Sequence, residues 1–68
     1  MATSRGVGMR LRKLRAAQGM TQVALAKQAK VSQGFIAQLE GGSPKDPRLS
    51  TLRRLAKALK TTVGELVE

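Results

Sequence analysis

This 68-residue chain lacks four residue types that carry much of protein chemistry. Without Cys it can form neither a disulfide nor a thiolate metal site, which suits a reducing cytoplasm. Without His it lacks the usual general base and the usual transition-metal ligand. Trp and Tyr are also absent, and Phe35 is the single aromatic residue. Base stacking on aromatic side chains, as in single-strand binders, is therefore nearly excluded.

Acidic residues are scarce as well, because 4 Asp and Glu stand against 13 Lys and Arg, for a formal net charge of +9. The lone Asp46 and three scattered Glu provide no acid–base or nucleophile pair. We therefore expect no enzyme activity, cofactor or metal. No apolar run is long enough for a membrane span or a signal peptide, so we expect no membrane partner. Hydrophobic residues make up 41% of the chain, enough for the core of one small, basic, cytoplasmic domain.

The hydrophobic pattern predicts an all-α fold with short connections, since strand-like alternation is missing throughout. Leu52, Leu55 and Leu59 recur at helical spacing, as do apolar residues in each earlier segment. Pro44 and Pro47 lie in a polar stretch that predicts a loop. The expected helices cover residues 7–18, 22–29, 33–40 and 51–60, and a short helix follows Thr62.

Polar residues at the segment boundaries predict where these helices begin. Thr21, Ser32 and Ser50 each precede an apolar-periodic segment and are expected to cap it through their hydroxyl groups. Thr62 and Glu65 have the spacing of a capping box for the last short helix. Gly19 is expected to end the first helix in a left-handed conformation.

The segment from Ser32 to Glu40 has an unusual polar face. At about 100° per residue, Phe35, Ile36 and Leu39 fall on one side of the helix. The opposite side carries Gln33, Gly34, Ala37 and Gln38. Amide side chains can bond adenine bidentately, and small residues allow a helix to approach a groove closely. Surface Gln is also common on solvent-exposed helices, so the face alone leaves both interpretations open. Two capped helices joined by a very short turn in so basic a chain favour a DNA-binding helix-turn-helix.

Several motifs resemble the Cro/C1-type (XRE) helix-turn-helix family of phage and bacterial repressors. They are Thr21-Gln22-x-x-Leu25-Ala26, Val31-Ser32-Gln33, Ile36, Leu39-Glu40-x-Gly42 and Pro47, with Gly8-x-x-Leu11-Arg12-x-Leu14-Arg15 before them and Leu52-x-x-Leu55-Ala56-x-Ala58-Leu59 and Val63-x-x-Leu66 after them. The likeness spans about residues 7 to 67, nearly the whole chain. It implies a compact five-helix bundle over residues 7–68, preceded by a flexible basic arm over residues 1–6.

The resemblance also implies roles for individual residues. Base-reading or groove-lining positions of the family correspond to Gln22, Ser32, Gln33, Gly34 and Gln38. Phosphate-contacting positions correspond to Thr21, Lys45 and Arg48. Arg15 and Glu40 correspond to a partly buried ion pair that joins the first helix to the end of the third, which is a structural role.

The chain departs from the family pattern at three positions. Lys30 stands in the turn where the family usually has Gly, and a left-handed conformation there would cost on the order of 1 kcal/mol. Lys30 is either a strained turn residue without further role or an added charge near the DNA backbone. Gly34 weakens the reading helix and offers no side chain for base contacts. Ala24 replaces an acidic residue and removes a capping-box contact.

These features predict a sequence-specific, double-stranded-DNA-binding transcription regulator in the cytoplasm, associated with the nucleoid. We expect a repressor that binds a two-fold-symmetric operator as a homodimer, because one small domain reads only a few base pairs. The alternative is an antitoxin that represses its own operon and binds a toxin protein. Val63, Leu66 and Val67 either form the dimer surface or close the core, and the sequence leaves both possibilities open.

Overall fold

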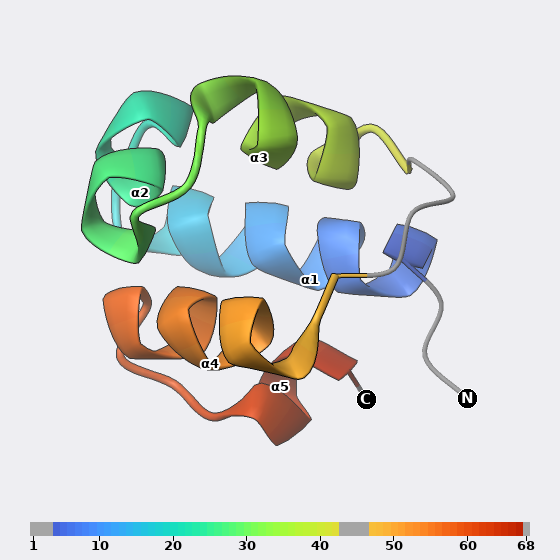
Figure 1. Cartoon of the computed structure of the whole chain (residues 1–68). Helices are drawn as coiled ribbons and strands as arrows, with labels where there is room; N and C mark the ends of the chain where they lie inside the picture. The colour runs from blue at the N-terminus through green and yellow to red at the C-terminus, as the bar shows by residue number, and fades with distance from the viewer. Residues whose placement is uncertain (1–3, 43–46, 68) are drawn as a thin grey trace.

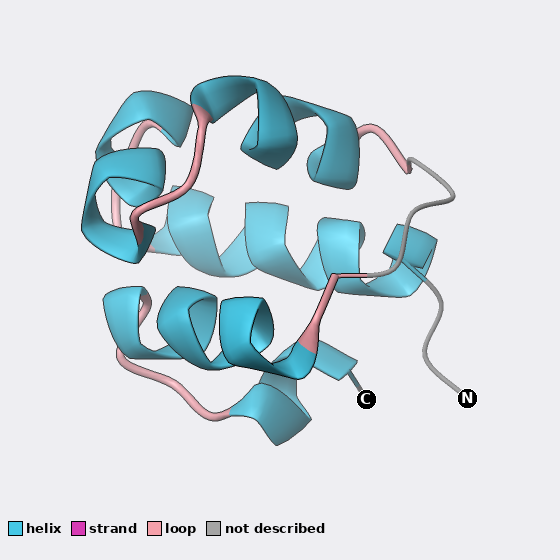
Figure 2. Cartoon of the chain, viewed as in Figure 1, coloured by secondary structure: helices cyan, strands magenta, loops and turns pink. Residues whose placement is uncertain are grey.

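The computed structural model describes residues 4–42 and 47–67, and the secondary structure of these residues is entirely helical (Figures 1 and 2). The helices are α1 (Ser4–Ala17), α2 (Gln22–Ala29), α3 (Gln33–Glu40), α4 (Leu49–Ala58) and α5 (Val63–Val67). The predicted all-α, five-helix architecture is confirmed. Among the described residues, no helix has the length and apolar character needed to cross a membrane.

The helices surround one small core. In Figure 1, α1 crosses the middle of the molecule, with α2 and α3 above it and α4 and α5 below. α1 packs against α3 and α5, while α4 packs against α2 and α5. The fully buried large side chains come from all five helices and the end of α4: Leu11, Leu25, Ile36, Leu39, Leu55, Leu59 and Leu66. Burial of each such side chain contributes about 1.5–3 kcal/mol, which holds α3 on the bundle through Ile36 and Leu39.

Three helices begin with the predicted hydroxyl caps. The Thr21 hydroxyl accepts the N–H of Ala24 at 3.0 Å, and the Ser32 hydroxyl accepts the N–H of Phe35 at 3.0 Å. The Thr62 hydroxyl accepts the Glu65 N–H at 3.3 Å, which is the hydroxyl half of the predicted capping box. Each bond satisfies an amide that would otherwise lack a partner in the first helical turn. The bounds of α2 and α3 agree with the sequence prediction.

The bounds of α1 and α4 differ from the prediction, since these helices end at Ala17 and Ala58 instead of at residues 18 and 60 and also begin earlier. α1 begins at Ser4 rather than Val7, so residues 4–6 of the expected arm are helical, while residues 1–3 lie outside the described part of the chain. Val7 is already buried against the core, which stabilises the turn that precedes it. The expected Ser50 cap is wrong, because α4 begins at Leu49 and Arg48 is its N-cap without a side-chain cap bond. The Arg48 carbonyl accepts the Leu52 N–H at 2.9 Å, so the first turn closes around buried Leu52.

Helices α1 to α4 are each followed by a residue with a positive φ angle. Gly19 and Gly42 have this conformation after α1 and α3, whereas Lys30 (φ 59°) and Lys60 (φ 55°) have it after α2 and α4. The Lys30 N–H bonds the Lys27 carbonyl at 3.3 Å, and the next N–H bonds the Ala26 carbonyl at 3.0 Å. The turn at Lys60 repeats this double bond, a Schellman motif. The left-handed conformation at Lys30 agrees with the prediction, but that at Lys60 was not anticipated.

Gly8 allows α1 and α3 to approach each other closely. A Cβ atom at this position would lie 1.9 Å from the Leu39 carbonyl oxygen and 3.2 Å from the Glu40 Cα. Both neighbours are backbone atoms, so no side-chain rotation could relieve the overlap. The glycine therefore sets how deeply the end of α3 sits on α1, and through that approach it positions the outer face of α3.

Candidate nucleic-acid interface

The outer face of α3 is exposed. Its polar residues Gln33, Gly34 and Gln38 are all accessible to solvent, while Ile36 and Leu39 lie in the core. Phe35 is half-buried and packs against the core from the side. Both amides therefore extend from a helix whose opposite face is anchored, as the sequence predicts. This arrangement presents hydrogen-bond donors and acceptors on a rigid support that is narrow enough for a major groove.

Gly34 lies at the open centre of this face. A Cβ atom built there would meet no heavy atom within 4 Å, so nothing in the chain's own packing requires a glycine. Its φ angle is not in the left-handed region either. Since glycine weakens a helix interior by up to about 1 kcal/mol relative to alanine, its presence favours close approach by a molecule outside the chain.

The turn between α2 and α3 orients the two helices. After Lys30, the half-buried Val31 packs against the core, and Ser32 then caps α3. Ser32 and Gln33 are exposed at this end, where the free N–H groups of the first turn give the helix terminus partial positive charge. The beginning of α3 is thus suited to contact phosphates and base edges together.

An ion-pair network joins α1, α2 and α3 beneath this face. The Arg15 Nε donates to Glu40 Oε2 at 2.7 Å, and Arg15 Nη2 donates to Glu40 Oε1 at 2.9 Å. Arg15 Nη1 also donates to the Met20 carbonyl at 2.7 Å. The side chains of Arg15 and Glu40 are only 15% and 4% exposed, so solvent screens the pair weakly. The predicted structural ion pair is confirmed.

Gln22 belongs to the same network. Its Nε2 donates to Glu40 Oε1 at 3.1 Å, and the residue is partly buried. The family resemblance assigned Gln22 to the DNA groove alone and gave no sign of this internal bond. The carboxylate of Glu40 is thereby satisfied from two helices, which fixes the start of α2 relative to the end of α3. A groove contact by Gln22 stays a prediction.

The network shifts the ionisation of both charged partners. Burial alone would raise the pKa of Glu40, but hydrogen bonds from Arg15 and Gln22, with the charges of Arg15 and Arg12, hold that pKa below its ordinary value. The hydrogen bond to Glu40 raises the pKa of Arg15 despite desolvation, so both groups stay charged at neutral pH. The cationic partner therefore offsets the negative charge of Glu40 at the end of α3.

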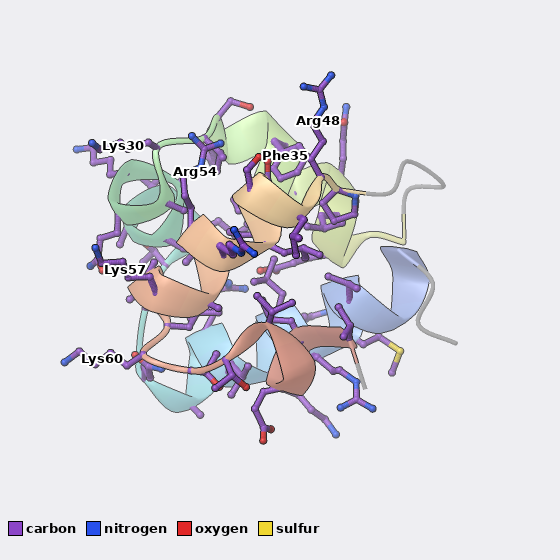
Figure 3. All side chains as sticks on the ribbon, turned by 60° about the horizontal axis from the view of Figure 1, so that its bottom comes forward. Lys30, Phe35, Arg48, Arg54, Lys57 and Lys60 are labelled. Atoms are coloured by element: carbon purple, nitrogen blue, oxygen red, sulfur yellow. The ribbon has the colours of Figure 1, made fainter. Side chains whose placement is uncertain are left out.

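Two of the three predicted phosphate contacts, Thr21 and Arg48, lie in the described part of the chain. Thr21 is exposed, and its hydroxyl, which accepts the Ala24 N–H, can still donate its own hydrogen to a phosphate oxygen. Arg48 is exposed at the start of α4, on the same side as Phe35 in Figure 3. Lys45 lies outside the described residues. The structure thus places Thr21 and Arg48 at the start of α2 and the start of α4.

Residues 7–68 match the family described as "Helix-turn-helix domain". The chain belongs to this helix-turn-helix family. The match covers all five helices apart from the first turn of α1. It agrees with the resemblance to Cro/C1-type regulators found in the sequence, and the capped pair α2 and α3 is the helix-turn-helix itself.

Known proteins resemble this helix-turn-helix domain over much of its length. The antitoxin candidate HigA2 of Mycobacterium tuberculosis is 42% identical over 50 residues, which are 74% of this chain and 50% of HigA2. The restriction-modification controller protein C.AhdI of Aeromonas hydrophila is 32% identical, with a TM-score of 0.86, covering 93% of this chain and 94% of C.AhdI. Hydroxypropylphosphonic acid epoxidase of S. wedmorenis is 28% identical, with a TM-score of 0.88, covering 98% of this chain and 35% of the epoxidase. The chain therefore spans about half the length of the antitoxin relative.

The end of the helix-turn-helix domain closes the core. Leu66 of α5 is fully buried, and Val63 and Val67 are partly buried against the core cluster. The sequence left open whether these three residues form a dimer surface or close the core, and Leu66 closes the core. Of these three residues, Val63 and Val67 keep apolar surface that a second protomer could contact.

Proposed function

We propose that this chain represses transcription by binding a two-fold-symmetric operator as a homodimer, with α3 in the major groove. That it is a DNA-binding regulator of helix-turn-helix type follows from its family and fold. The observation that carries the finer proposal is the outward amide face of α3, backed by buried Ile36 and Leu39. In this proposal Gln33 and Gln38 read base edges, while Ser32, Gly34 and Gln22 line the groove.

Phosphate contacts in the proposal come from the three residues that match the family's backbone-contacting positions. Thr21, Arg48 and Lys45 hold the sugar-phosphate backbone, which fixes the register of α3 without reading sequence. Because these residues contact groups that every duplex carries, their removal should weaken all sequences alike. Removal of a base-reading residue should instead change the preference for particular bases.

Selection of bound duplexes from a random pool tests sequence reading. Wild-type protein should enrich one motif, arranged as two inverted half-sites about 10 base pairs apart if it binds as a dimer. Gln33→Ala should relax discrimination at one base position by about 1–3 kcal/mol, whereas Arg48→Gln should weaken every sequence equally. Gln28→Ala is the matched control for base preference, because Gln28 is an exposed amide on α2 that lines a hollow beside α4 and not the α3 face, and its removal should leave the preferred bases unchanged. Enrichment of no motif by the wild type would contradict the proposal.

The dimer is tested by stoichiometry. Sedimentation of the protein with its selected duplex should give two chains for each symmetric site. Replacing Val63 or Val67 with Lys should reduce this to one chain on a half-site, with a normal circular dichroism spectrum showing that the fold is intact. Two chains bound by the Val63→Lys and Val67→Lys variants would place the dimer interface elsewhere.

A second candidate function is that of an antitoxin, favoured by the 42% identity to HigA2. In this case the same DNA-binding face would repress the operon, while another surface would bind a toxin protein. Coexpression with the product of the adjacent gene tests it, and a stable complex in the absence of DNA is the expected result. Two separate peaks in size-exclusion chromatography would contradict the antitoxin function and favour the repressor without a toxin partner.

We also propose that the chain acts by binding alone, in the cytoplasm and at the nucleoid. The absence of Cys and His from the sequence, with Glu40 engaged by Arg15, favours a non-catalytic module. Duplex recovered from the complex should be uncut and unmodified by mass spectrometry. Fluorescence microscopy of a tagged chain should show it coincident with the chromosome, and a diffuse or membrane signal would contradict the location.

A further inference from the structure

A basic hollow lies beside the helix-turn-helix, between the end of α2 and the face of α4. It is open, has a volume of about 410 Å³, and is lined by Gln28, Lys30, Arg54, Lys57 and Ala58. Three of these five residues are cations and none is acidic. Figure 3 shows Lys30, Arg54 and Lys57 on one side of the molecule, with Lys60 on that side at the end of α4. We call Lys30, Arg54, Lys57 and Lys60 the basic flank.

Two residues of the basic flank occupy strained backbone positions. Among the described residues, Lys30 and Lys60 are the non-glycine residues with positive φ angles, while Gly19 and Gly42 follow the other two long helices. A left-handed conformation is easy for glycine and costly for residues with a Cβ atom. Both turns thus carry a cation where glycine would be more stable. Strained residues of this kind cluster at functional sites, which makes these two side chains candidates for a binding role.

Helix polarity by itself explains only part of the basic flank. Cations near helix C-termini are stabilised by the partial negative charge there, which applies to Lys30 and Lys60. Arg54 lies in the middle of α4, where this effect is absent, and it adds to the mutual repulsion of the flank. Of the carboxylates in the described residues, Glu40 binds Arg15 and Glu65 lies on α5. Neither lines the hollow, so the flank is suited to an anion from outside the chain.

We infer that the basic flank binds the phosphate backbone of the duplex just outside the base pairs that α3 reads, an inference that rests on the proposed function. Lys30 precedes the Ser32 cap by two residues, so the flank begins at the end of α3 that would enter the groove. In Figure 3, Lys30 and Arg54 lie in the upper left of the view and Phe35 and Arg48 to their right, all four toward the upper edge. A duplex strand presents a phosphate about every 3.4 Å, so a strand passing this edge can meet cations from both α2 and α4.

Net charge disfavours a second copy of this chain as the partner of the flank. A second copy has 4 acidic residues against 13 basic ones, so two copies would repel at this surface. An acidic protein would satisfy the charge, but nothing ties such a partner to the end of α3. Continuity with the reading helix favours DNA.

Salt dependence measures phosphate binding by the flank directly. For each phosphate that the protein no longer neutralises, the slope of log affinity against log salt concentration should become shallower by about 0.9. Lys57→Gln and Arg54→Gln should each show this change on a duplex that extends about six base pairs beyond the selected site, and neither should show it on a duplex that ends at the site. Lys13→Gln is the matched control, since Lys13 is an exposed cation that lines a different hollow, with Met9 and Arg10 on α1. Lys13→Gln should keep the wild-type slope.

Glycine variants at Lys30 and Lys60 are expected to weaken DNA binding while they stabilise the fold. Lys30→Gly and Lys60→Gly each remove a charge and relieve a left-handed residue. Both variants should raise the midpoint of thermal unfolding by several degrees. On the extended duplex, each variant should have a lower affinity than the wild type at 50 mM salt. Its affinity should also fall less between 50 and 200 mM salt, by a factor of about three for each phosphate that it no longer neutralises. A folding defect cannot produce this combination, because the weaker binder is the more stable protein.

The results separate the inference from the proposed function. Equal salt slopes for Lys57→Gln, Lys13→Gln and wild type on the extended duplex would overturn the inference while sequence selection by the wild type still holds. Weaker binding of poly-glutamate by the flank variants, without a change in the DNA slope, would instead identify an acidic protein as the partner. Failure of the wild type to select any sequence would overturn the proposed function, and slopes on random duplex would then show whether the flank contacts phosphate.

Discussion

Substitution of Gly8 by alanine tests whether α3 is positioned by its close backbone approach to α1. The added Cβ would lie 1.9 Å from the Leu39 carbonyl oxygen, whereas real Cβ atoms essentially never approach a heavy atom within 3.0 Å. The two helices must therefore separate by more than an ångström, because neither partner is a movable side chain. Separation on this scale loosens the packing of buried Leu11 and Leu39.

The expected change in the free energy of unfolding for Gly8→Ala follows from two opposing effects. Overpacking of a tight core costs about 1–3 kcal/mol, and the rigid backbone on both sides puts Gly8→Ala at the upper end. Alanine regains up to about 1 kcal/mol of helix propensity. We expect a net loss of about 2 kcal/mol, which lowers the unfolding midpoint by about 8–16 °C in a domain of this size.

Gly34→Ala is the matched control for this experiment, because its added Cβ meets nothing within 4 Å. It should raise the unfolding midpoint by about 4–8 °C through helix propensity alone. Thermal unfolding followed by circular dichroism at 222 nm measures both variants. A Gly8→Ala protein as stable as the wild type would refute the close approach of α1 and α3.

Further predictions concern the ion pair, a cap and the reading face. Because the pKa of Glu40 is depressed in the folded state, its stabilising contribution is present above the ordinary Glu pKa of about 4.3 and is lost as pH falls through the lower folded value. Urea unfolding should show wild-type stability declining below about pH 4.3, and Glu40→Gln should flatten that decline while costing about 3 kcal/mol at pH 7. An equal pH dependence for both proteins would contradict the depressed pKa. Ser32→Ala should cost about 1 kcal/mol in the same assay, whereas Ser50→Ala, which removes no cap, should change stability by less than about 0.5 kcal/mol. Gly34→Ala should also weaken binding of the selected duplex in a gel shift if DNA approaches the open face, and unchanged affinity would show that the groove does not come near Gly34.

Helix boundaries that depend on residues close in the sequence were predictable. α2 and α3 begin where Thr21 and Ser32 offer a hydroxyl to an amide three positions ahead, and that bond needs no distant partner. The inward orientation of Ile36 and Leu39 follows from helical period alone. Ser50 misled the prediction because it also looked like a cap, although the backbone had already turned helical after Arg48.

Contacts between distant segments were not predictable in the same way. Gly8 and Leu39 meet only because α1 and α3 cross, and Gln22 reaches Glu40 only because α2 starts beside the end of α3. The ion pair of Arg15 with Glu40 was anticipated through family resemblance, since residues 25 positions apart carry no local signal of pairing.

Periodicity and caps therefore suffice for the helices of this chain and for the exposed side of α3, because both depend on hydrogen bonds and burial patterns within one or two turns. The depth of α3 on α1, the satisfied charge of Glu40 and the gathering of Lys30, Arg54 and Lys57 around one hollow arise from packing. They depend on which helix surfaces come together, and the cost or benefit of each interaction exists only once the bundle has closed.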